Sequence, residues 1–402
     1  MKSQTLGSSL LVAGTSIGAG MLALPLISAT TGLWWALLLM LIMWGLATYG
    51  GLLIAEACRA CPEAENLHGV VGKLMGHTGQ LVTVLGMLFL YYSLCSAYIS
   101  GGASVLQNLL DKWNLMISFK FCALIVTATV AVLVVTGTEV VDVVNRIMFA
   151  LMLLLLVIIL YFLIPETRFE HLAMESGSPA IMLAALPVLY SSFGYHCAVP
   201  TVVQYVNGKP YKFRRALIAG SILPFIIYII WQTTVIGVLS SSTIIAFAGD
   251  SNGVNEMMNT LSDASLTPSL GYLITAFAAL ALTTSFLGVS LGLFDYLTDV
   301  YHRPHNLKGR IQTVCFTLLL PLLAALYLPG SFIIALGYAA IALVVVAVFI
   351  PVATVWKVRK LHMEEPYQVA GGIPALIIAV LAGCLVIAAQ LGMVTGQLPS
   401  IG

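Results

Sequence analysis

Charged residues are scarce in this sequence. Asp, Glu, Lys and Arg make up 8% of its 402 residues, whereas hydrophobic residues make up 60%. A soluble domain has roughly 25% charged residues, which cover its surface. The scarcity of charge therefore excludes an ordinary soluble domain and a disordered chain. The surplus of apolar residues predicts a protein that is embedded in a lipid bilayer.

An excess of positive charge and a regular set of cysteines are also missing. The formal net charge is +1, so the chain has no basic field with which to bind nucleic acid. The seven cysteines are odd in number and lie mostly in apolar runs, which is not typical of a disulfide framework. Cys58 and Cys61 form a CxxC motif without a second pair, so we expect neither a metal site nor a cofactor.

Long apolar runs predict membrane-spanning helices. A spanning helix needs about 20 mainly apolar residues. Eleven segments meet this requirement, near residues 6–28, 32–56, 79–107, 118–136, 143–164, 178–204, 214–239, 269–297, 311–328, 330–355 and 372–394. We therefore expect an all-α polytopic membrane protein with eleven transmembrane helices.

The basic residues predict an orientation. If the N-terminus is cytoplasmic, 14 of the 17 Lys and Arg residues fall on the cytoplasmic side of these spans. Basic residues concentrate in cytoplasmic loops of membrane proteins. We therefore expect a cytoplasmic N-terminus and, after an odd number of spans, a C-terminus on the outer side.

The first and sixth spans contain helix-breaking patterns. Ser16-Ile17-Gly18 precedes Pro25, and Ser192-Phe193-Gly194 precedes Pro200. Proline removes a backbone donor and glycine adds backbone freedom, so both segments favour unwinding in mid-membrane. The free amides of a half-helix suit a carboxylate and free carbonyls suit an ammonium, which together make a site for a zwitterion. The alternative is that these small residues serve close helix packing.

The positions of these two spans favour the first interpretation. They are the first and sixth of eleven, as expected for a transporter built from two inverted repeats with paired interrupted helices. We therefore predict a first half at 1–170, a second half at 171–356, and helix 11 with the tail at 357–402. Because each half has five spans, the second half would be inverted relative to the first.

Several motifs resemble a known family along nearly the whole chain. The chain is similar to the hydroxy and aromatic amino acid permease family in Thr5-Leu6-Gly7, in the run Gly14–Pro25, in Ser192–His196 and in Thr284–Leu297. The resemblance implies a LeuT-type fold and a place in the bacterial inner membrane, with the C-terminus periplasmic. It also implies proton symport of an aromatic amino acid by alternating access, with L-tyrosine expected first. Tryptophan or another neutral amino acid is the alternative substrate.

The resemblance also implies roles for the interrupted helices. Amides near Ala19, Gly20 and Met21 would bind the substrate carboxylate, and carbonyls near Ser192 and Phe193 would bind its ammonium. Ser16, Gly18 and Gly194 belong to the same unwound segments.

The resemblance favours a proton as the coupling ion. Thr284 and Ser285 resemble the paired hydroxyls that sodium-coupled carriers of this fold use in the eighth span. Met21 stands where such carriers have a sodium-binding asparagine, so a proton is the better fit.

Few ionisable residues are available for coupling. His196 is the one histidine expected near mid-membrane, and an imidazole titrates near neutral pH. It would carry the proton or donate to a substrate hydroxyl, or it would be a satisfied packing residue. Asp295 and Asp299 near the inner end of the eighth span, and Asp142 and Arg146 in the fifth, would form a cytoplasmic gate. The alternative is that these are interfacial charges that pair locally.

Aromatic residues could line a pocket for an aromatic substrate. Tyr91 and Tyr92 in the third span and Phe286 in the eighth are candidates, and contact with lipid or neighbouring helices is the alternative.

One motif points to a different class of protein. Gly288, Ser290 and Gly292 match the GxSxG pattern of hydrolases. That motif requires a strand-to-helix elbow, whereas here it falls inside a predicted membrane helix, so an intramembrane hydrolase is the less favoured reading.

Overall fold

The structure is a computed structural model of the chain. It describes residues 2–61, 63–64, 66–172, 177–248, 250, 252–264, 268–301, 306–327, 332–361 and 367–401. Every regular element in these ranges is a helix. In chain order they are α1 (Lys2–Ser16), α2 (Gly20–Thr31), α3 (Leu33–Ala60), α4 (Leu67–Lys112), α5 (Phe119–Thr136), α6 (Thr138–Leu163), η1 (Ile164–Glu166), η2 (Phe169–Leu172), α7 (Pro179–Ser191), η3 (His196–Ala198), α8 (Val199–Tyr205), α9 (Pro210–Leu239), α10 (Ser241–Ile245), α11 (Gly253–Asp263), α12 (Pro268–Tyr301), α13 (Leu307–Tyr327), α14 (Phe332–Val344), η4 (Val345–Phe349), α15 (Ile350–Lys360) and α16 (Gly372–Val394).

The helices account for the predicted spans. Within the described ranges, ten helices are long and apolar enough to cross a membrane, and a bent pair, Gln4–Ser16 with Gly20–Thr31, makes an eleventh if it is one span. The all-α, multi-pass class is therefore confirmed. The two members of the bent pair meet at an angle of 61°, so the first span is interrupted where its Ser-x-Gly pattern predicts.

One span begins earlier than its sequence suggests. We expect the third span at 79–107, whereas α4 begins at Leu67 and contains a kink at Gly76, with φ 72° and ψ −163°. This positive φ is accessible to glycine and strained for other residues. The residues before the kink form a short extra piece of helix that carries His68 and Lys73.

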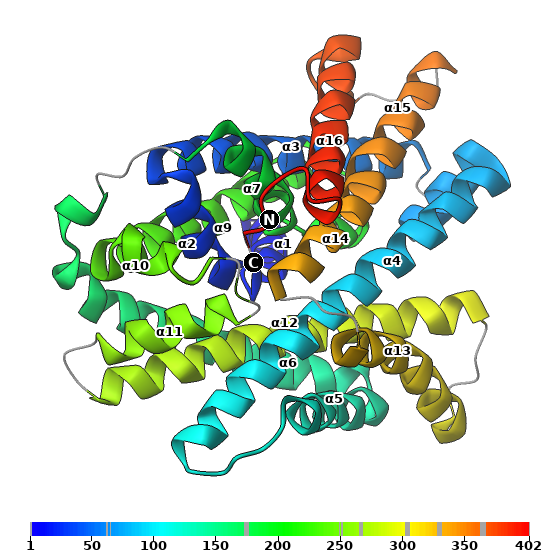
Figure 1. The fold of residues 1–402 in the computed structure, drawn as a ribbon. Coiled ribbons are helices and arrows are strands. Elements are labelled where there is room, and N and C mark those ends of the chain that lie inside the picture. Colours follow the sequence, from blue (N-terminus) through cyan, green and yellow to red (C-terminus); the bar gives the residue numbers. More distant parts are fainter. Residues whose placement is uncertain are drawn as a thin grey trace.

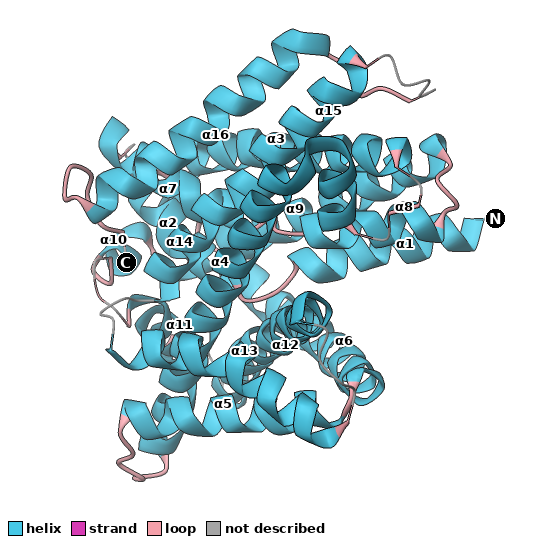
Figure 2. Ribbon diagram, turned by 90° about the vertical axis from the view of Figure 1, so that its right-hand side faces the viewer, coloured by secondary structure: helices cyan, strands magenta, loops and turns pink. Residues whose placement is uncertain are grey.

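The helices form two groups that pack against each other (Figure 1). In one group α1, α2 and α3 pack against α7, α8 and α9; in the other, α4, α5 and α6 pack against α12 and α13. Helix α14 contacts both groups, through α4 and α7. Figure 2 shows α5, α12 and α13 on one side of the long α4, with α1, α3 and α9 on the other.

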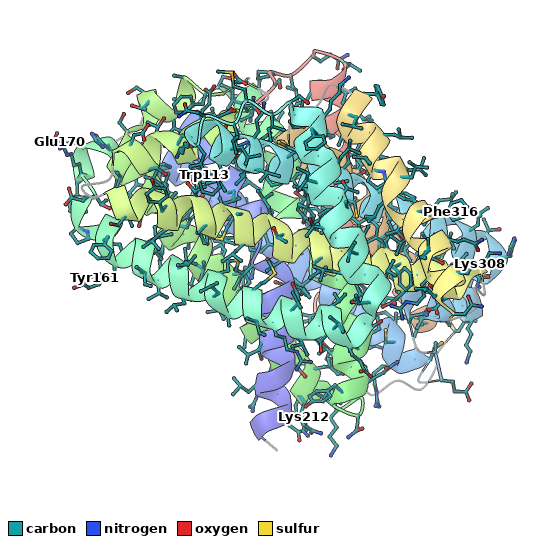
Figure 3. The ribbon with its side chains drawn as sticks, turned by 90° about the horizontal axis from the view of Figure 1, so that it is seen from below. Trp113, Tyr161, Glu170, Lys212, Lys308 and Phe316 are labelled. Atoms are coloured by element: carbon teal, nitrogen blue, oxygen red, sulfur yellow. The ribbon has the colours of Figure 1, made fainter. Side chains whose placement is uncertain are left out.

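The outer surface is apolar, as a bilayer requires. The window of α5 that would cross the membrane is only 28% buried inside the protein. Large apolar side chains such as Tyr161 and Phe316 project from the helices (Figure 3). Such a surface is unfavourable in water but matches lipid tails.

A buried ion pair connects α3 to α15. Arg359 donates to both carboxylate oxygens of Glu56, at 2.7 and 2.8 Å, and the backbone N–H of Val369 donates to the same carboxylate at 2.7 Å. The side chain of Glu56 is 1% exposed. Because all of these partners are charged or oriented toward the carboxylate, they offset the cost of removing it from water. The pair fixes the end of α3 against the segment that leads to α16.

Candidate functional site

The break between α1 and α2 is held by a hydroxyl from α12. The amide of Ala19 donates to Oγ of Ser285 at 3.0 Å. A Cβ on Gly18 would clash with the same hydroxyl, so the glycine is what allows α12 to approach the unwound segment. The amide of Met21 donates to the carbonyl of Gly18 at 3.2 Å. Two of the three amides expected to bind a carboxylate thus already have acceptors in this structure.

The second break separates α7 from α8. Helix α7 ends at Ser191, and a short non-helical stretch leads into η3 at His196. Pro200 lies in the first turn of α8, where its missing N–H would have no partner in the helix anyway. The sixth span is therefore interrupted, as its sequence predicts.

The two breaks touch each other. A Cβ on Gly20 would lie 3.3 Å from Cα and Oγ of Ser192. The hydroxyl of Tyr228, on α9, lies 2.6 Å from the carbonyl oxygen of Ser16 and 3.0 Å from that of Ser192. Tyr228 is fully buried. The hydroxyl of this one side chain therefore contacts a carbonyl oxygen at each of the two breaks.

A cavity of about 290 Å³ lies beside the two breaks. We call it the central cavity, and its volume is close to the lower limit of about 300 Å³ for small-molecule sites. Its walls come from α1, α4, α6, the second break, α12 and α14, and include Thr15, Ile17, Tyr91, Tyr98, Asn145, Phe149, Ser191, Gly194, Cys197, Thr284, Ser285 and Gly288.

Most hydroxyls in this wall are already engaged. Thr15, Ser191 and Thr284 each donate to a carbonyl of their own helix. The hydroxyl of Tyr98 lies within hydrogen-bond reach of Ser285. By contrast, Oδ1 of Asn145 is buried and has no hydrogen-bond partner among the described residues. The cavity thus combines aromatic walls with one unpaired amide oxygen.

Two further hollows lie along α4, one on each side of the central cavity. A hollow of about 170 Å³, the chamber, is lined near the start of α4 by His68, Thr83, Met87 and Tyr91. A hollow of about 480 Å³, the vestibule, is lined near the end of α4 by Ser100, Gly101, Ser104 and Gln107. The chamber shares Tyr91, Cys197 and Gly292 with the central cavity.

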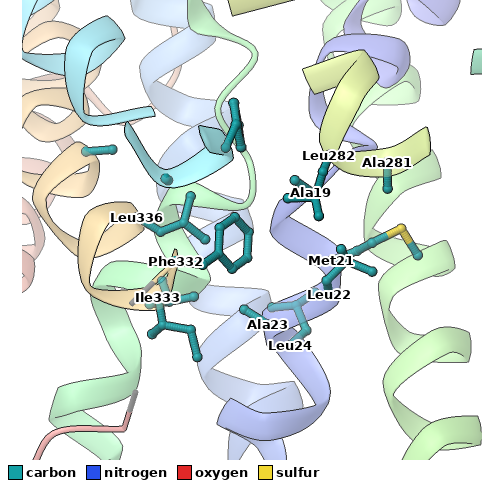
Figure 4. Close-up of a cluster of buried hydrophobic side chains, with 14 of the residues drawn as sticks. Ala19, Met21, Leu22, Ala23, Leu24, Ala281, Leu282, Phe332, Ile333 and Leu336 are labelled. Atoms are coloured by element: carbon teal, nitrogen blue, oxygen red, sulfur yellow. The ribbon is translucent and has the colours of Figure 1, made fainter. Parts of the chain in front are cut away.

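An apolar layer lies between the vestibule and the central cavity. Figure 4 shows Leu22 of α2, Leu282 of α12 and Phe332 of α14 in this layer. All three line the vestibule and are at most 6% exposed. Tyr98 of the central cavity lies with its ring centroid 6.5 Å from that of Phe332. The cavity is closed by side chains on this side and adjoins the chamber on the other.

The structure brings together only some of the candidate binding residues. Tyr91, Gly194, Thr284 and Ser285 line the central cavity. Ser16, Gly18, Ala19, Gly20 and Ser192 lie at the breaks beside it, as their hydrogen bonds and close contacts show. Met21 belongs to the apolar cluster of Figure 4, and Phe193 packs against Phe225 and Tyr228.

Two candidate aromatics lie elsewhere. The hydroxyl of Tyr92 donates to the carbonyl of Phe316, and its ring lines a separate hollow against α13 and α14. Phe286 lines another hollow, between α4, α5 and α12.

The candidate coupling residues are spread over the molecule. His196 is 1% exposed and lines the chamber rather than the central cavity. Asp299 also lines the chamber, whereas Asp295 is exposed on α12. Asp142 and Arg146 form an ion pair with each other on an exposed part of α6.

The hydrolase reading has no structural support. Ser290 is fully buried inside the continuous helix α12, and its hydroxyl lies 3.8 Å from Sγ of Cys95.

Sequence reasoning missed Tyr228 and underrated Asn145. Tyr228 lies in an apolar helix, and its acceptors are 212 and 36 residues away in the chain, so no local signal marks it. Asn145 is noticeable as an amide inside an apolar run, but its position between Asp142 and Arg146 suggests an interfacial cluster instead.

The fold defines a polytopic helical membrane protein with a cavity beside two interrupted helices, an arrangement typical of secondary transporters. Residues 1–390 match the Tryptophan/tyrosine permease family, and the chain belongs to that family. It is therefore a transporter and not an enzyme.

Curated relatives align over almost the full length. Tyrosine-specific transport system 1 of Haemophilus influenzae is 35% identical, over 99% of each chain. Glutamine transporter 2 of Aliivibrio fischeri is 34% identical, over 97% of this chain and 100% of its own. A tryptophan-specific transport protein of Pseudomonas aeruginosa is 31% identical, over 94% of this chain and 92% of its own.

Replacing Tyr228 with phenylalanine tests the link between the two breaks. The change Tyr228→Phe removes one hydroxyl and leaves two buried carbonyls without their donor, at a cost of about 1–3 kcal/mol. We expect amino acid uptake by membrane vesicles to fall about tenfold at equal protein amount. Tyr211→Phe, on the same helix but 51% exposed, is the matched control. Equal uptake by the two variants would contradict the role of the bridge.

Filling the central cavity tests whether substrate occupies it. A Cβ on Gly288 meets nothing within 4 Å, so Gly288→Leu would place its side chain in the cavity without displacing the backbone. We expect uptake to fall at least tenfold, which corresponds to about 1.4 kcal/mol of lost binding, with the thermal stability of the purified protein unchanged. Gly45→Leu is the control, because Gly45 also faces open space but does not line the cavity. Normal uptake by Gly288→Leu would show that substrate binds elsewhere.

Proposed function

We propose that this chain is a proton-coupled symporter that imports an aromatic amino acid, L-tyrosine first, by alternating access. One observation carries the proposal: a cavity lies beside two interrupted helices, with a hollow on either side of it along α4. A transporter that exposes one binding site alternately to the two faces of a membrane needs a space on each side of that site. The location that goes with it is the bacterial inner membrane, with a cytoplasmic N-terminus and a periplasmic C-terminus.

The packing of the helices supports a LeuT-type arrangement of two inverted halves. Helix α2 packs on α7, α3 on α9, α4 on α12 and α5 on α13. Each of these pairs joins a span of the first half to the span five positions later, as expected for halves 1–170 and 171–356 related by a two-fold axis. Residues 357–402, with α16, are then an addition to this core.

The wall of the central cavity supports an aromatic substrate with a polar group on its ring. Tyr91, Tyr98 and Phe149 provide aromatic surface, and the unpaired Oδ1 of Asn145 would accept a hydrogen bond. The phenol O–H of tyrosine and the indole N–H of tryptophan are both donors. Tryptophan therefore remains the alternative, and the glutamine transporter among the relatives keeps other neutral amino acids as candidates.

His196 is the coupling residue that this function favours. It lies in the second break, and one of its ring nitrogens is 2.9 Å from the carbonyl of Ala47 on α3. One proton that moves down roughly 100 mV supplies about 2.3 kcal/mol. A tenfold ratio of substrate concentrations across the membrane costs about 1.4 kcal/mol, so one proton sustains a ratio of roughly fifty-fold. A single titrating group is therefore enough.

Proton-driven uptake tests the coupling. Purified protein in proteoliposomes is expected to accumulate labelled tyrosine when the outside is made acidic, because proton entry drives the symport. His196→Ala is expected to lose this accumulation, whereas His77→Ala, an exposed histidine on α4, is expected to keep it. Uptake that follows a sodium gradient and ignores the proton gradient would contradict the proposal. Near-normal accumulation by His196→Ala would remove that residue from the mechanism.

Competition between amino acids tests the substrate. Tyrosine and tryptophan are expected to inhibit uptake of labelled tyrosine about tenfold more strongly than phenylalanine, since phenylalanine leaves the Asn145 oxygen buried and unpaired. Asn145→Leu is expected to abolish this difference while inhibition by phenylalanine, the internal control, stays unchanged. Stronger inhibition by glutamine than by any aromatic amino acid would overturn the assignment.

A further inference from the structure

The chamber beside the central cavity is too small to be a second substrate site. Its volume is about 170 Å³, against about 290 Å³ for the central cavity. It lies between the start of α4, the second break and the end of α12. Its rim includes Asn66, Thr201 and Asp299, which are exposed. The chamber therefore runs from the buried His196 to the surface of the protein.

Three side chains that line the chamber have polar atoms without partners. Nδ1 of His68, Nδ1 of His196 and the hydroxyl oxygen of Tyr296 are buried and have no hydrogen-bond partner among the described residues. Burying a polar atom without a partner is costly. All three belong to side chains that line the same hollow, so water within it would be the nearest partner for them.

The hydrogen-bonding roles of these atoms are complementary. At His196, Nε2 donates to the carbonyl of Ala47, so in the neutral ring Nδ1 is an acceptor. At His68, Nε2 lies 2.7 Å from the side-chain nitrogen of Gln80, which donates, so Nδ1 carries a hydrogen and is a donor. The hydroxyl of Tyr296 both donates and accepts, and its ring stands edge-on to His68 at 6.5 Å. Water, which also both donates and accepts, can pair with each of the three.

The volume fits a short chain of water molecules. A single water needs about 10–15 Å³ of such space and two to four polar partners, so the chamber has room for several. We propose that water in this chamber conducts the coupled proton between His196 and the face of the protein at Asp299. This inference rests on the proposed function, in which His196 carries the proton.

The transfer requires no other reactant. The imidazolium of His196 gives the proton on Nδ1 to the adjacent water, and that water passes one of its own protons along the chain toward the rim. His196 returns to the neutral ring, still bonded to Ala47, and one proton leaves the chamber for each one that His196 releases. His68 and Tyr296 position the water and are not themselves consumed.

The groups around His196 are consistent with this path. The titratable residues of its own segment are Tyr190, Tyr195 and Cys197. The ring of Tyr195 stacks on that of His196, with the ring centroids 4.9 Å apart. From α3 it meets Ala47 and Gly50, which carry no titratable group.

The chamber wall adds His68, Tyr91, Tyr296 and Asp299. Asp299 is the one carboxylate that lines the chamber among the described residues, and it lies at the exposed rim.

Two variants separate proton conduction from substrate transport. Tyr296→Phe removes only a hydroxyl, and His68→Gln removes the imidazole. A side chain that itself transfers a proton contributes about 100-fold or more. Because these two side chains only position the water, we expect both variants to reduce tyrosine accumulation driven by a pH gradient in proteoliposomes by at least about tenfold. Exchange of external labelled tyrosine for internal unlabelled tyrosine, at equal pH on both sides, moves no net proton and is expected to stay within about twofold of the wild type.

Matched controls lie on the same helices. Tyr272→Phe, on α12 and 64% exposed, and His77→Gln, on the exposed part of α4, are expected to leave both activities unchanged.

Each outcome decides the inference. Driven accumulation that stays normal in Tyr296→Phe and His68→Gln, while the wild type couples to protons, overturns the water path alone. Loss of exchange together with accumulation also overturns it, because these side chains would then serve the substrate path or the fold. A wild-type protein that does not respond to a proton gradient overturns the proposed function, and this inference with it.

Discussion

Backbone groups that leave a helix inside a membrane must find partners within the protein, and the two breaks of this chain meet that demand with very few side chains. The hydroxyl of Tyr228 faces the carbonyls of Ser16 and Ser192, and the hydroxyl of Ser285 accepts from Ala19. Without such partners the unwound segments would not be tolerated at membrane depth. The hydroxyl from α9 joins the two breaks within one helix group, and the hydroxyl from α12 joins the first break to the other group.

The same constraint shapes the space around the breaks. Small residues allow the unwound segments to approach each other and α12, and the central cavity occupies the volume next to them. On one side Leu22, Leu282 and Phe332, which line the vestibule, belong to a cluster of buried apolar side chains (Figure 4). On the other side the path narrows into a polar chamber. The two sides of the central cavity thus differ, with an apolar cluster on one side and a polar chamber on the other.

Because charged residues are scarce, the few buried charges and the uncharged polar groups of this protein have different surroundings. The buried carboxylate of Glu56 is matched by Arg359 and a backbone amide, because an unmatched charge at this depth would be destabilising. Among the described residues that line the central cavity and the chamber, the one carboxylate is that of Asp299, at the exposed rim, and the other polar groups are hydroxyls, amides, a thiol and imidazoles. Neutral groups can be left without protein partners at moderate cost, so they are suited to bind substrate or water that comes and goes.

The sequence alone determined the membrane class, the ten or eleven candidate spans and the two interrupted helices. These depend on local composition: apolar runs of sufficient length, and Ser-x-Gly with a following proline. It also marked Tyr91, Gly194, Thr284 and Ser285, which line the cavity. Tertiary structure alone decided that Tyr92 and Phe286 face other hollows, that His196 faces the chamber and that Tyr228 joins the breaks. Which side of a helix meets a cavity depends on the neighbours that pack against it, and those neighbours come from segments far away in the chain.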